Sequence, residues 1–156
     1  MNIVLNMVKH MGSLKVKRKN NLSDFPDSLT ASEKGYPPIF DFMEYWIVYL
    51  DDIPVGYTGC LMFPNFCFVG NTYIKKEYRG KGFHSFLLKV RNKQLNGIPK
   101  IAILNPIENS KMQNLVNVVS KLGYRQVKDY EDISDIMSKY FYLEIKKKNQ
   151  QIWRID

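Results

Sequence analysis

A change of hydrophobic period near residue 80 constrains the fold more than any other feature of the sequence. Upstream of it, three runs rich in aromatic and β-branched residues follow one another: EYWIVYL (44–50), VGYTGCLMF (55–63) and FCFVGNTYI (66–74). The turn-forming sequences DDIP and PN separate these runs, which therefore predict three strands of an antiparallel meander. Downstream, apolar residues recur at the spacing of a helix.

The rest of the chain predicts further helices and strands. Over 82–95, apolar residues occur at positions i, i+3, i+4 and i+7, which form one face of a helix. A second helix is expected over 108–123, with Asn109 or Ser110 as its cap and Gly123 at its end. We expect the other strands at 2–8, 100–105, 124–130 and 139–146.

Helices between strands require some parallel pairing, whereas the meander requires antiparallel pairing. A single mixed sheet of about six to seven strands with flanking helices satisfies both, so we expect a mixed α/β fold. The length suits one domain spanning 1–156. Within it, 9–43 is the least defined region, and its stretch NNLSDFPDSLTASEKGYPP (20–38) is rich in turn formers and is expected to hold at most short helices. We expect 146–156 to be a basic tail. Pro54 and Pro64 are expected in turns, where a missing N–H costs no ladder hydrogen bond.

The net charge of +8 favours an anionic partner such as nucleic acid, a membrane surface or a polyphosphate ligand. The cations gather at 15–19, 75–81 and 146–148, and we expect the first and last groups to be solvated, partly mobile flanks. No apolar run approaches the ~20 residues of a membrane span. The basic cluster near the start follows the apolar stretch, which is the reverse of a secretion signal. We therefore expect a cytoplasmic protein without a membrane partner.

The cysteines and histidines do not predict a metal site. Cys60 and Cys67 flank the sequence LMFPNF, and His10 and His84 lie far from each other in the chain. This spacing matches no metal-ligand pattern. We expect both thiols to be buried and free in a reducing compartment.

The segment EYRGKGFHSFLL (77–88) places two glycines and two cations where the predicted helix begins. Gly80 and Gly82 permit positive φ angles, which bring main-chain amides close to a ligand. Amides of the first helical turn have no intrahelical partner and lie at the positive end of the helix dipole. Arg79 and Lys81 add full charges, and Ser85 adds a hydroxyl group. The segment therefore predicts a site for a phosphate-bearing ligand.

The stretch YIKKEYRGKGFHSFLL (73–88) resembles the coenzyme A loop of the GNAT family of N-acetyltransferases, whose pattern is [QR]-x-x-G-x-[GA]. Arg79 and Gly82 match its first two fixed positions. SKLGYRQV (120–127) resembles the segment that ends a helix and starts the sixth strand of that family, and the order of elements matches from about residue 44 onward. The resemblance implies an enzyme that transfers an acetyl group from acetyl-CoA directly to an amine acceptor within a ternary complex.

The resemblance also implies a set of coenzyme-binding residues. The diphosphate would rest on the amides of 80–85, and the pantetheine arm would run beside 72–74, in a gap between this strand and the one that ends at Asn105. His84 replaces the small residue that ends the loop pattern of the family, and Asn109 lies about one turn before the position of a helix-start asparagine. The implied coenzyme-binding residues are Ile74, Arg79, Gly80, Lys81, Gly82, Phe83, His84, Ser85 and Asn109.

The catalytic residues that the resemblance implies are less well defined. A backbone N–H near Tyr73 would stabilise the oxyanion, and Asn105 would line the channel and hold a water molecule. Val119 stands where the family often has a tyrosine acid, with Ser120 next to it. Glu44 is a candidate general base.

Three other interpretations remain open. Aromatic strands and a basic surface are also found in nucleic-acid-binding modules. An acyltransferase acting on a nucleic-acid or ribonucleoprotein acceptor combines the two interpretations. A catalytically inactive relative that binds coenzyme A is the third. KYFYLEI (139–145), read as an exposed strand, suggests a homodimer.

Overall fold

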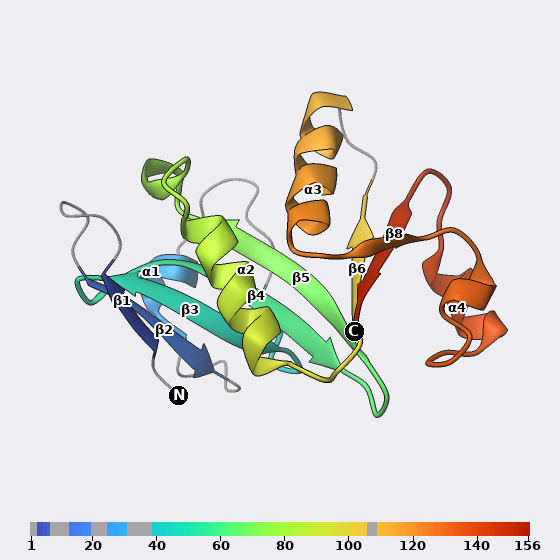
Figure 1. Ribbon diagram of the computed structural model, residues 1–156. Helices are drawn as coiled ribbons and strands as arrows, with labels where there is room; N and C mark the ends of the chain where they lie inside the picture. The colour runs from blue at the N-terminus through green and yellow to red at the C-terminus, as the bar shows by residue number, and fades with distance from the viewer. Residues whose placement is uncertain (1–2, 7–12, 20–24, 31–38, 106–108) are drawn as a thin grey trace. The chain divides into compact units, whose positions relative to one another are not determined.

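A single mixed β-sheet forms the framework of the protein (Figure 1). The computed structural model describes residues 3–6, 13–19, 25–30, 39–105 and 109–156. In this part of the chain, eight strands are hydrogen-bonded in the order β1-β2-β3-β4-β5-β6-β8-β7. The strands are β1 (Ile3–Asn6), β2 (Ser13–Lys19), β3 (Glu44–Leu50), β4 (Ile53–Met62), β5 (Cys67–Ile74), β6 (Lys100–Leu104), β7 (Arg125–Val127) and β8 (Gln151–Ile155). The mixed sheet with flanking helices is confirmed, with at least one strand more than expected.

Two compact units make up the chain, and one strand contributes to both. The first unit comprises Met1–Met62 and Gly70–Leu95, and the second comprises Phe63–Val69 and Asn96–Asp156. In the second unit, the first three residues of β5 pair in parallel with the first three of β6. The remaining residues of β5 belong to the first unit.

The hairpin of β3 and β4 is the centre of the first unit. Asp51 and Asp52 form its two-residue turn with φ angles of 47° and 67°, the left-handed conformation that a tight hairpin turn requires. Pro54, which is expected in the turn, is instead part of β4 opposite Tyr49. The register shifts between Val48 and Tyr49, and such an irregularity accommodates a residue that lacks an N–H.

β2 corrects the prediction that 15–19 is a solvated flank. It pairs antiparallel with β3, and its apolar residues Leu14 and Val16 are fully buried. Lys15 and Lys17 alternate with them and are only partly buried. The predicted strand over 2–8 corresponds to β1, and residues 2, 7 and 8 lie outside the described part. Within 9–43, the one described helix is α1 (Asp27–Thr30), a single turn as expected.

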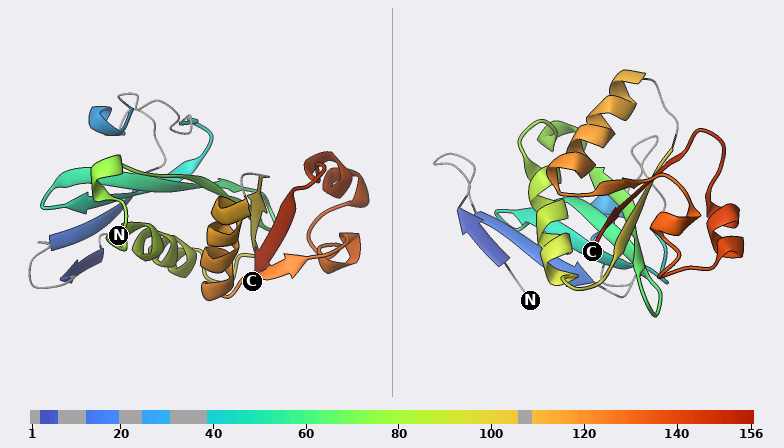
Figure 2. Two further views of the ribbon diagram at one scale, coloured as in Figure 1. Left: turned by 90° about the horizontal axis from the view of Figure 1, so that it is seen from above. Right: turned by 45° about the vertical axis from the view of Figure 1, so that its right-hand side comes forward.

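Helix α2 (Phe83–Gln94) covers one face of the first unit's strands, and α1 lies on the opposite face (Figure 2). On the α2 face, Trp46 Nε1 donates to Gln94 Oε1 at 2.8 Å. On the other face, the rings of Phe25, Tyr45 and Tyr57 meet edge to face at 5.1–5.7 Å. Because successive strand residues point to opposite faces, β3 supplies both layers of this core.

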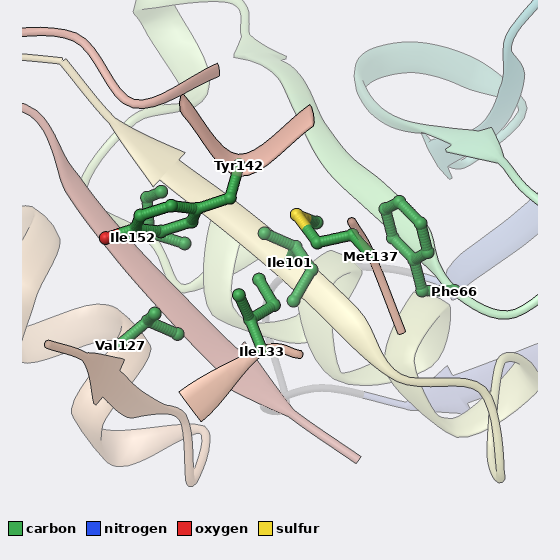
Figure 3. Close-up of a cluster of buried hydrophobic side chains, with 7 residues drawn as sticks. All are labelled: Phe66, Ile101, Val127, Ile133, Met137, Tyr142 and Ile152. Atoms are coloured by element: carbon green, nitrogen blue, oxygen red, sulfur yellow. The ribbon is translucent and has the colours of Figure 1, made fainter. Parts of the chain in front are cut away.

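In the second unit, β8 lies between β6 and β7 and pairs antiparallel with both. Helix α3 (Asn109–Lys121) packs its apolar stripe, which includes Val119, against Tyr124 and Trp153, as its spacing predicts. Gly123 follows α3 with φ 93°, which confirms it as the helix terminator. Seven buried side chains form a second cluster (Figure 3). They come from Phe66, which immediately precedes β5, from β6, β7, β8 and helix α4 (Lys139–Ile145), and from the connection between β7 and α4.

Two predictions for the C-terminal region are wrong. KYFYLEI (139–145) is helix α4 and not a strand, and the Ser138 hydroxyl caps it by accepting from the Phe141 amide at 3.2 Å. The last strand is β8, which lies within the predicted tail over 146–156. A dimer built on pairing of 139–145 as a strand therefore has no basis. Cys60 and Cys67 are buried thiols that are not joined in a disulfide, as predicted.

Two short 3-10 helices complete the described chain, η2 (Lys76–Tyr78) and η3 (Tyr130–Asp132). Among the described residues, no helix has the length and apolar character needed to cross a membrane.

Candidate functional site

The first unit contains a cavity of about 460 Å³ where β5 ends and α2 begins. Its wall consists of three consecutive segments of chain: the end of β5, the η2 turn with the loop that follows, and the first turn of α2. The lining residues are Thr72, Tyr73, Ile74, Tyr78, Arg79, Gly80, Gly82, Phe83 and His84.

The loop between η2 and α2 leaves main-chain amides available to a ligand. Gly80 and Gly82 have φ angles of 76° and 87°, which explains why glycine is needed at both. The first α-helical hydrogen bond of α2 runs from the Phe86 amide to the Gly82 carbonyl at 3.1 Å, so the amides of 83–85 precede it. Within the described part of the chain, the amides of 80–82 donate to no main-chain carbonyl. Six consecutive amides at the positive end of a helix are a site suited to an anion.

Two exposed cations border this loop. Arg79 is anchored because its Nε donates to the Ile74 carbonyl at 2.7 Å and its guanidinium carbon lies 5.5 Å from the centre of the Tyr73 ring. Lys81 Nζ lies 5.8 Å from the centre of the Tyr78 ring. The aromatic walls of the cavity therefore hold positive charge close to the unbonded amides.

A buried arginine lies behind the cavity. Arg91, on the inner face of α2, is 3% exposed, and its Nη1 donates to Thr58 Oγ1 at 2.8 Å. Thr58 Oγ1 in turn lies 2.7 Å from Thr72 Oγ1, and Thr72 lines the cavity. This chain of hydrogen bonds connects a buried cation to the cavity wall. Sequence reasoning missed Tyr78 and Arg91, although Tyr78 adjoins a predicted residue.

His84 is half-buried in the first turn of α2. Burial lowers the pKa of its imidazole, and the positive charge of Arg91 lowers this pKa further. Both effects disfavour the imidazolium form, so His84 is neutral at neutral pH in the ligand-free protein.

Asn71 has a φ angle of 52° inside β5, which is unusual for a residue other than glycine. Its amide nitrogen donates to the Tyr45 hydroxyl at 3.4 Å and to Met43 Sδ at 3.6 Å. The Phe40 amide also donates to the Tyr45 hydroxyl, at 3.0 Å. These contacts hold a strained backbone conformation immediately before the first lining residue of the cavity.

The structure brings seven of the predicted residues together around the cavity: Tyr73, Ile74, Arg79, Gly80, Gly82, Phe83 and His84. Lys81 and Ser85 belong to the same loop and helical turn but do not line it. Glu44 lies in the first unit, where its Oε2 accepts from Arg18 Nε at 2.6 Å, and it does not line the cavity.

The remaining predicted residues belong to the second unit. Asn105 is exposed after β6, and its Oδ1 accepts from Gln150 Nε2 at 2.6 Å. Ser120 is exposed on α3, and Asn109 begins that helix.

The fold and the site thus define an α/β protein in which a strand end, a glycine loop and a helix start surround a cavity, with main-chain amides suited to an anion. The chain belongs to the acetyltransferase (GNAT) family, because the model of this family matches residues 18–95, which are half of its 156 residues. The match contains the entire cavity lining. This result confirms the resemblance seen in the sequence. No curated protein shows significant sequence similarity to the chain.

Solved structures share this fold. The IAA acetyltransferase from Bacillus cereus ATCC 14579 has a TM-score of 0.58 and 18% identity, over 91% of this chain and 98% of that chain. A GNAT-family protein from Bacteroides thetaiotaomicron has a TM-score of 0.53 and 14% identity, and an acetyltransferase from Thermus thermophilus has 0.50 and 18%. In both of the latter, the match covers 74% of this chain and 64% of that chain. At such identities the likeness concerns the fold alone.

Proposed function

We propose that the protein transfers an acetyl group from acetyl-CoA to an amine acceptor, with both substrates bound at once. One observation carries the proposal: in a member of the acetyltransferase (GNAT) family, the amides of 80–85 precede the hydrogen-bonded part of α2 and border a cavity. Arg79 and Lys81 add positive charge at the same place. These features suit the diphosphate of a coenzyme.

The lining residues fit the other parts of the coenzyme as well. A methyl group at the position of a Gly80 side chain would meet no atom within 4 Å, so the loop leaves open space in front of its backbone. Thr72, Tyr73 and Ile74 offer a strand end along which a pantetheine arm can extend. The Ile74 carbonyl already accepts from Arg79, so the arm would find its partners at other backbone groups of this segment. When bound, the coenzyme supplies an activated acetyl thioester.

The contribution of the protein to the reaction is mainly placement and polarisation. Holding amine and thioester together supplies much of the rate. In our proposal, a backbone N–H near Tyr73 donates to the oxyanion that forms on the acetyl carbonyl. A lysine-like amine lies ~3 pKa units above neutrality, so forming the free base costs ~4 kcal/mol. Asn105 and Ser120 belong to the second unit and do not line the cavity, so the proposal gives them no catalytic role. Glu44, whose carboxylate is paired with Arg18, has no part in the proposal.

Thermal unfolding with acetyl-CoA tests the coenzyme site. At a concentration a hundredfold above the dissociation constant, binding should stabilise the protein by ~2.7 kcal/mol. Arg79→Ala should greatly reduce this gain. Arg125→Ala is a matched control, since Arg125 is exposed on β7 in the second unit, and this variant should keep the full gain. An unchanged melting temperature of the wild-type protein would refute the proposal.

An acetylation screen over classes of amine then tests transfer. The wild-type protein should move labelled acetyl from acetyl-CoA to at least one class, and Arg79→Ala should lower kcat/KM for it. Coenzyme binding without transfer to polyamines, peptide amines, aromatic amines or nucleic acids would instead support the interpretation as an inactive coenzyme-binding relative.

A further inference from the structure

We propose that His84 contacts the phosphate-bearing ligand of the cavity and gains a proton when that ligand binds, so that binding takes up a proton from solvent. The inference rests on the proposed function, because it takes the diphosphate of coenzyme A as the ligand. It assigns to His84 a role in setting affinity and its pH dependence.

The position of His84 carries this inference. His84 lines the cavity from the first turn of α2, next to the amides of 80–85. A diphosphate resting on these amides would therefore lie within reach of the imidazole. An uncharged imidazole offers one N–H donor, whereas an imidazolium offers two donors and a full charge.

The charges around His84 explain why it lacks the proton before binding. Arg91 faces it from within α2, and Arg79 and Lys81 lie on the preceding loop. Tyr73 from β5 and Tyr78 from η2 are the other titratable groups of the wall. Among the described residues, no carboxylate lines the cavity. Burial and like charge thus keep the pKa of His84 below 6.5 in the ligand-free protein.

A bound diphosphate reverses this balance. Its negative charges compensate the cations of the wall and favour the imidazolium form, as an opposite charge within about 4–6 Å does elsewhere. By linkage, a ligand that raises the pKa of a group binds more tightly when that group is protonated. The affinity should therefore increase as the pH falls from about 8 to 6, by up to about tenfold per pH unit.

The ligand used to test this inference must not itself gain or lose a proton between about pH 6 and 8. Coenzyme A carries a 3′-phosphate monoester whose second pKa lies near ~6, which would itself exchange protons. Dephospho-coenzyme A lacks this group but keeps the diphosphate, so it is the appropriate probe. Isothermal titration calorimetry at one pH, in buffers of different ionisation enthalpy, counts the protons taken up with it.

We expect the wild-type protein to take up a substantial fraction of one proton with dephospho-coenzyme A at neutral pH. His84→Gln should abolish the uptake and flatten the pH dependence of the affinity. His10→Gln is the matched control, as His10 is the only other histidine of the chain, and this variant should keep the uptake.

NMR gives a second readout that does not depend on a His84 variant. In His10→Gln, His84 is the sole imidazole, so its ring signals report its protonation directly. Its pKa should lie below 6.5 without ligand and rise by about 1 to 3 when dephospho-coenzyme A is bound.

The outcomes separate this inference from the proposed function. Binding of dephospho-coenzyme A without proton uptake, or with uptake that persists in His84→Gln, would overturn the role of His84 and leave the coenzyme site intact. If neither acetyl-CoA nor dephospho-coenzyme A bound to the wild-type protein, the proposed function would fail, and the inference would fail with it.

Discussion

Arg154 and Asp135 form a bidentate ion pair in the second unit. Arg154 Nη1 and Nη2 donate to Asp135 Oδ1 and Oδ2 at 2.6 and 2.7 Å. Arg154 is 4% exposed and belongs to β8, whereas Asp135 lies on the long connection between β7 and α4. The pair therefore fastens this connection to the sheet.

Replacing Asp135 by asparagine should destabilise the protein by about 1–2 kcal/mol, because it leaves a buried guanidinium with a weaker partner. The hydrogen bond from Arg154 holds the pKa of Asp135 below its usual 3.8. The stabilisation is therefore complete above that pH and is lost as the pH falls through the lowered pKa. In urea unfolding, the free energies of unfolding of the wild-type protein and Asp135→Asn should differ clearly at pH 7 and only slightly at pH 3. Glu131→Gln, an exposed acid of the same connection, should change little at either pH.

The close approach of β4 to the cavity wall gives a second prediction. A Cβ atom on Gly56 would lie 2.5 Å from Ile74 Cδ1 and 2.6 Å from the Tyr73 carbonyl oxygen. Gly56→Ala should therefore cost about 1–3 kcal/mol and displace the end of β5, which weakens acetyl-CoA binding. Thermal unfolding with and without acetyl-CoA measures both effects.

Gly70 supplies the control for this change. It also lies in a strand, but a Cβ atom there would meet nothing within 4 Å. Equal losses for Gly56→Ala and Gly70→Ala would show that crowding against β5 is not the cause.

A comparison of alanine substitutions at Gly80 and Gly97 distinguishes the cost of backbone strain from an effect on ligand binding. Gly80 and Gly97 have φ angles of 76° and 82°, and a Cβ atom on either would find open space. Alanine at each should cost about 1–2 kcal/mol through backbone strain alone. Only Gly80→Ala should also weaken acetyl-CoA binding in calorimetry, because only Gly80 lines the cavity. Unimpaired binding in Gly80→Ala would argue against the loop as the coenzyme site.

His84 should make the ligand-free protein sensitive to mild acid. Its pKa in the folded state lies below the unfolded value of 6.5, so the unfolded chain binds more protons between the two values. The free energy of unfolding should consequently be highest at neutral pH and fall as the pH drops below about 6.5. In His84→Gln, the melting temperature should decline less between pH 7 and pH 5 than in the wild-type protein. Parallel curves for the two proteins would contradict the burial of a neutral imidazole.

Phe141 anchors α4 to the second unit. Its ring lies 5.7, 6.2 and 5.9 Å from those of Phe63, Phe66 and Phe68. Because Phe141 is only partly buried, Phe141→Ala should cost about 2–3 kcal/mol in urea unfolding. The adjacent Tyr140 is 75% exposed, so Tyr140→Ala should stay within about 0.5 kcal/mol of the wild-type protein. Comparable losses for the two variants would contradict the packing of Phe141 on these three rings.

The parts of the fold that the sequence predicts are those in which local signals agree. In EYWIVYL (44–50), composition, alternation and flanking turns all favour a strand, and β3 has those bounds. The stripe of α2 and the Gly123 terminator of α3 are likewise local features. The amide loop at 80–85 was predictable for the same reason, because its glycines and cations are adjacent in the chain.

The failures arise where long-range packing decides. Aromatic residues of 139–145 favour a strand by composition, yet Phe141, Tyr142 and Ile145 share one helical face that packs on the second cluster. β8 was not predicted because its five residues lie shortly after KKK and include a charged residue, Arg154. Arg154 is buried because Asp135, Asp156 and the Asp132 carbonyl accept its hydrogen bonds. In β2, Lys15 bonds to Asp52 and Arg18 to Glu44, so two of the cations of 15–19 have partners within the protein.

The missed part of the site has the same origin. An arginine within a helix is ordinarily expected to be solvated. Arg91 is buried together with an acceptor for its hydrogen bond. This acceptor is Thr58, which lies in β4, thirty-three residues earlier in the chain. Only the folded arrangement brings Thr58 next to Thr72 and so connects this arginine to the cavity.

The path of the chain through its two units limits where it can be cut. The second unit takes the short segment Phe63–Val69 from the middle of the first. A fragment that stops at residue 95 would keep this segment but lose the side chains that cover Phe63, Phe66 and Phe68. Three phenylalanine rings would then be exposed to water, which promotes aggregation. Truncation at that boundary should therefore yield insoluble material, although every residue that lines the cavity lies upstream of it.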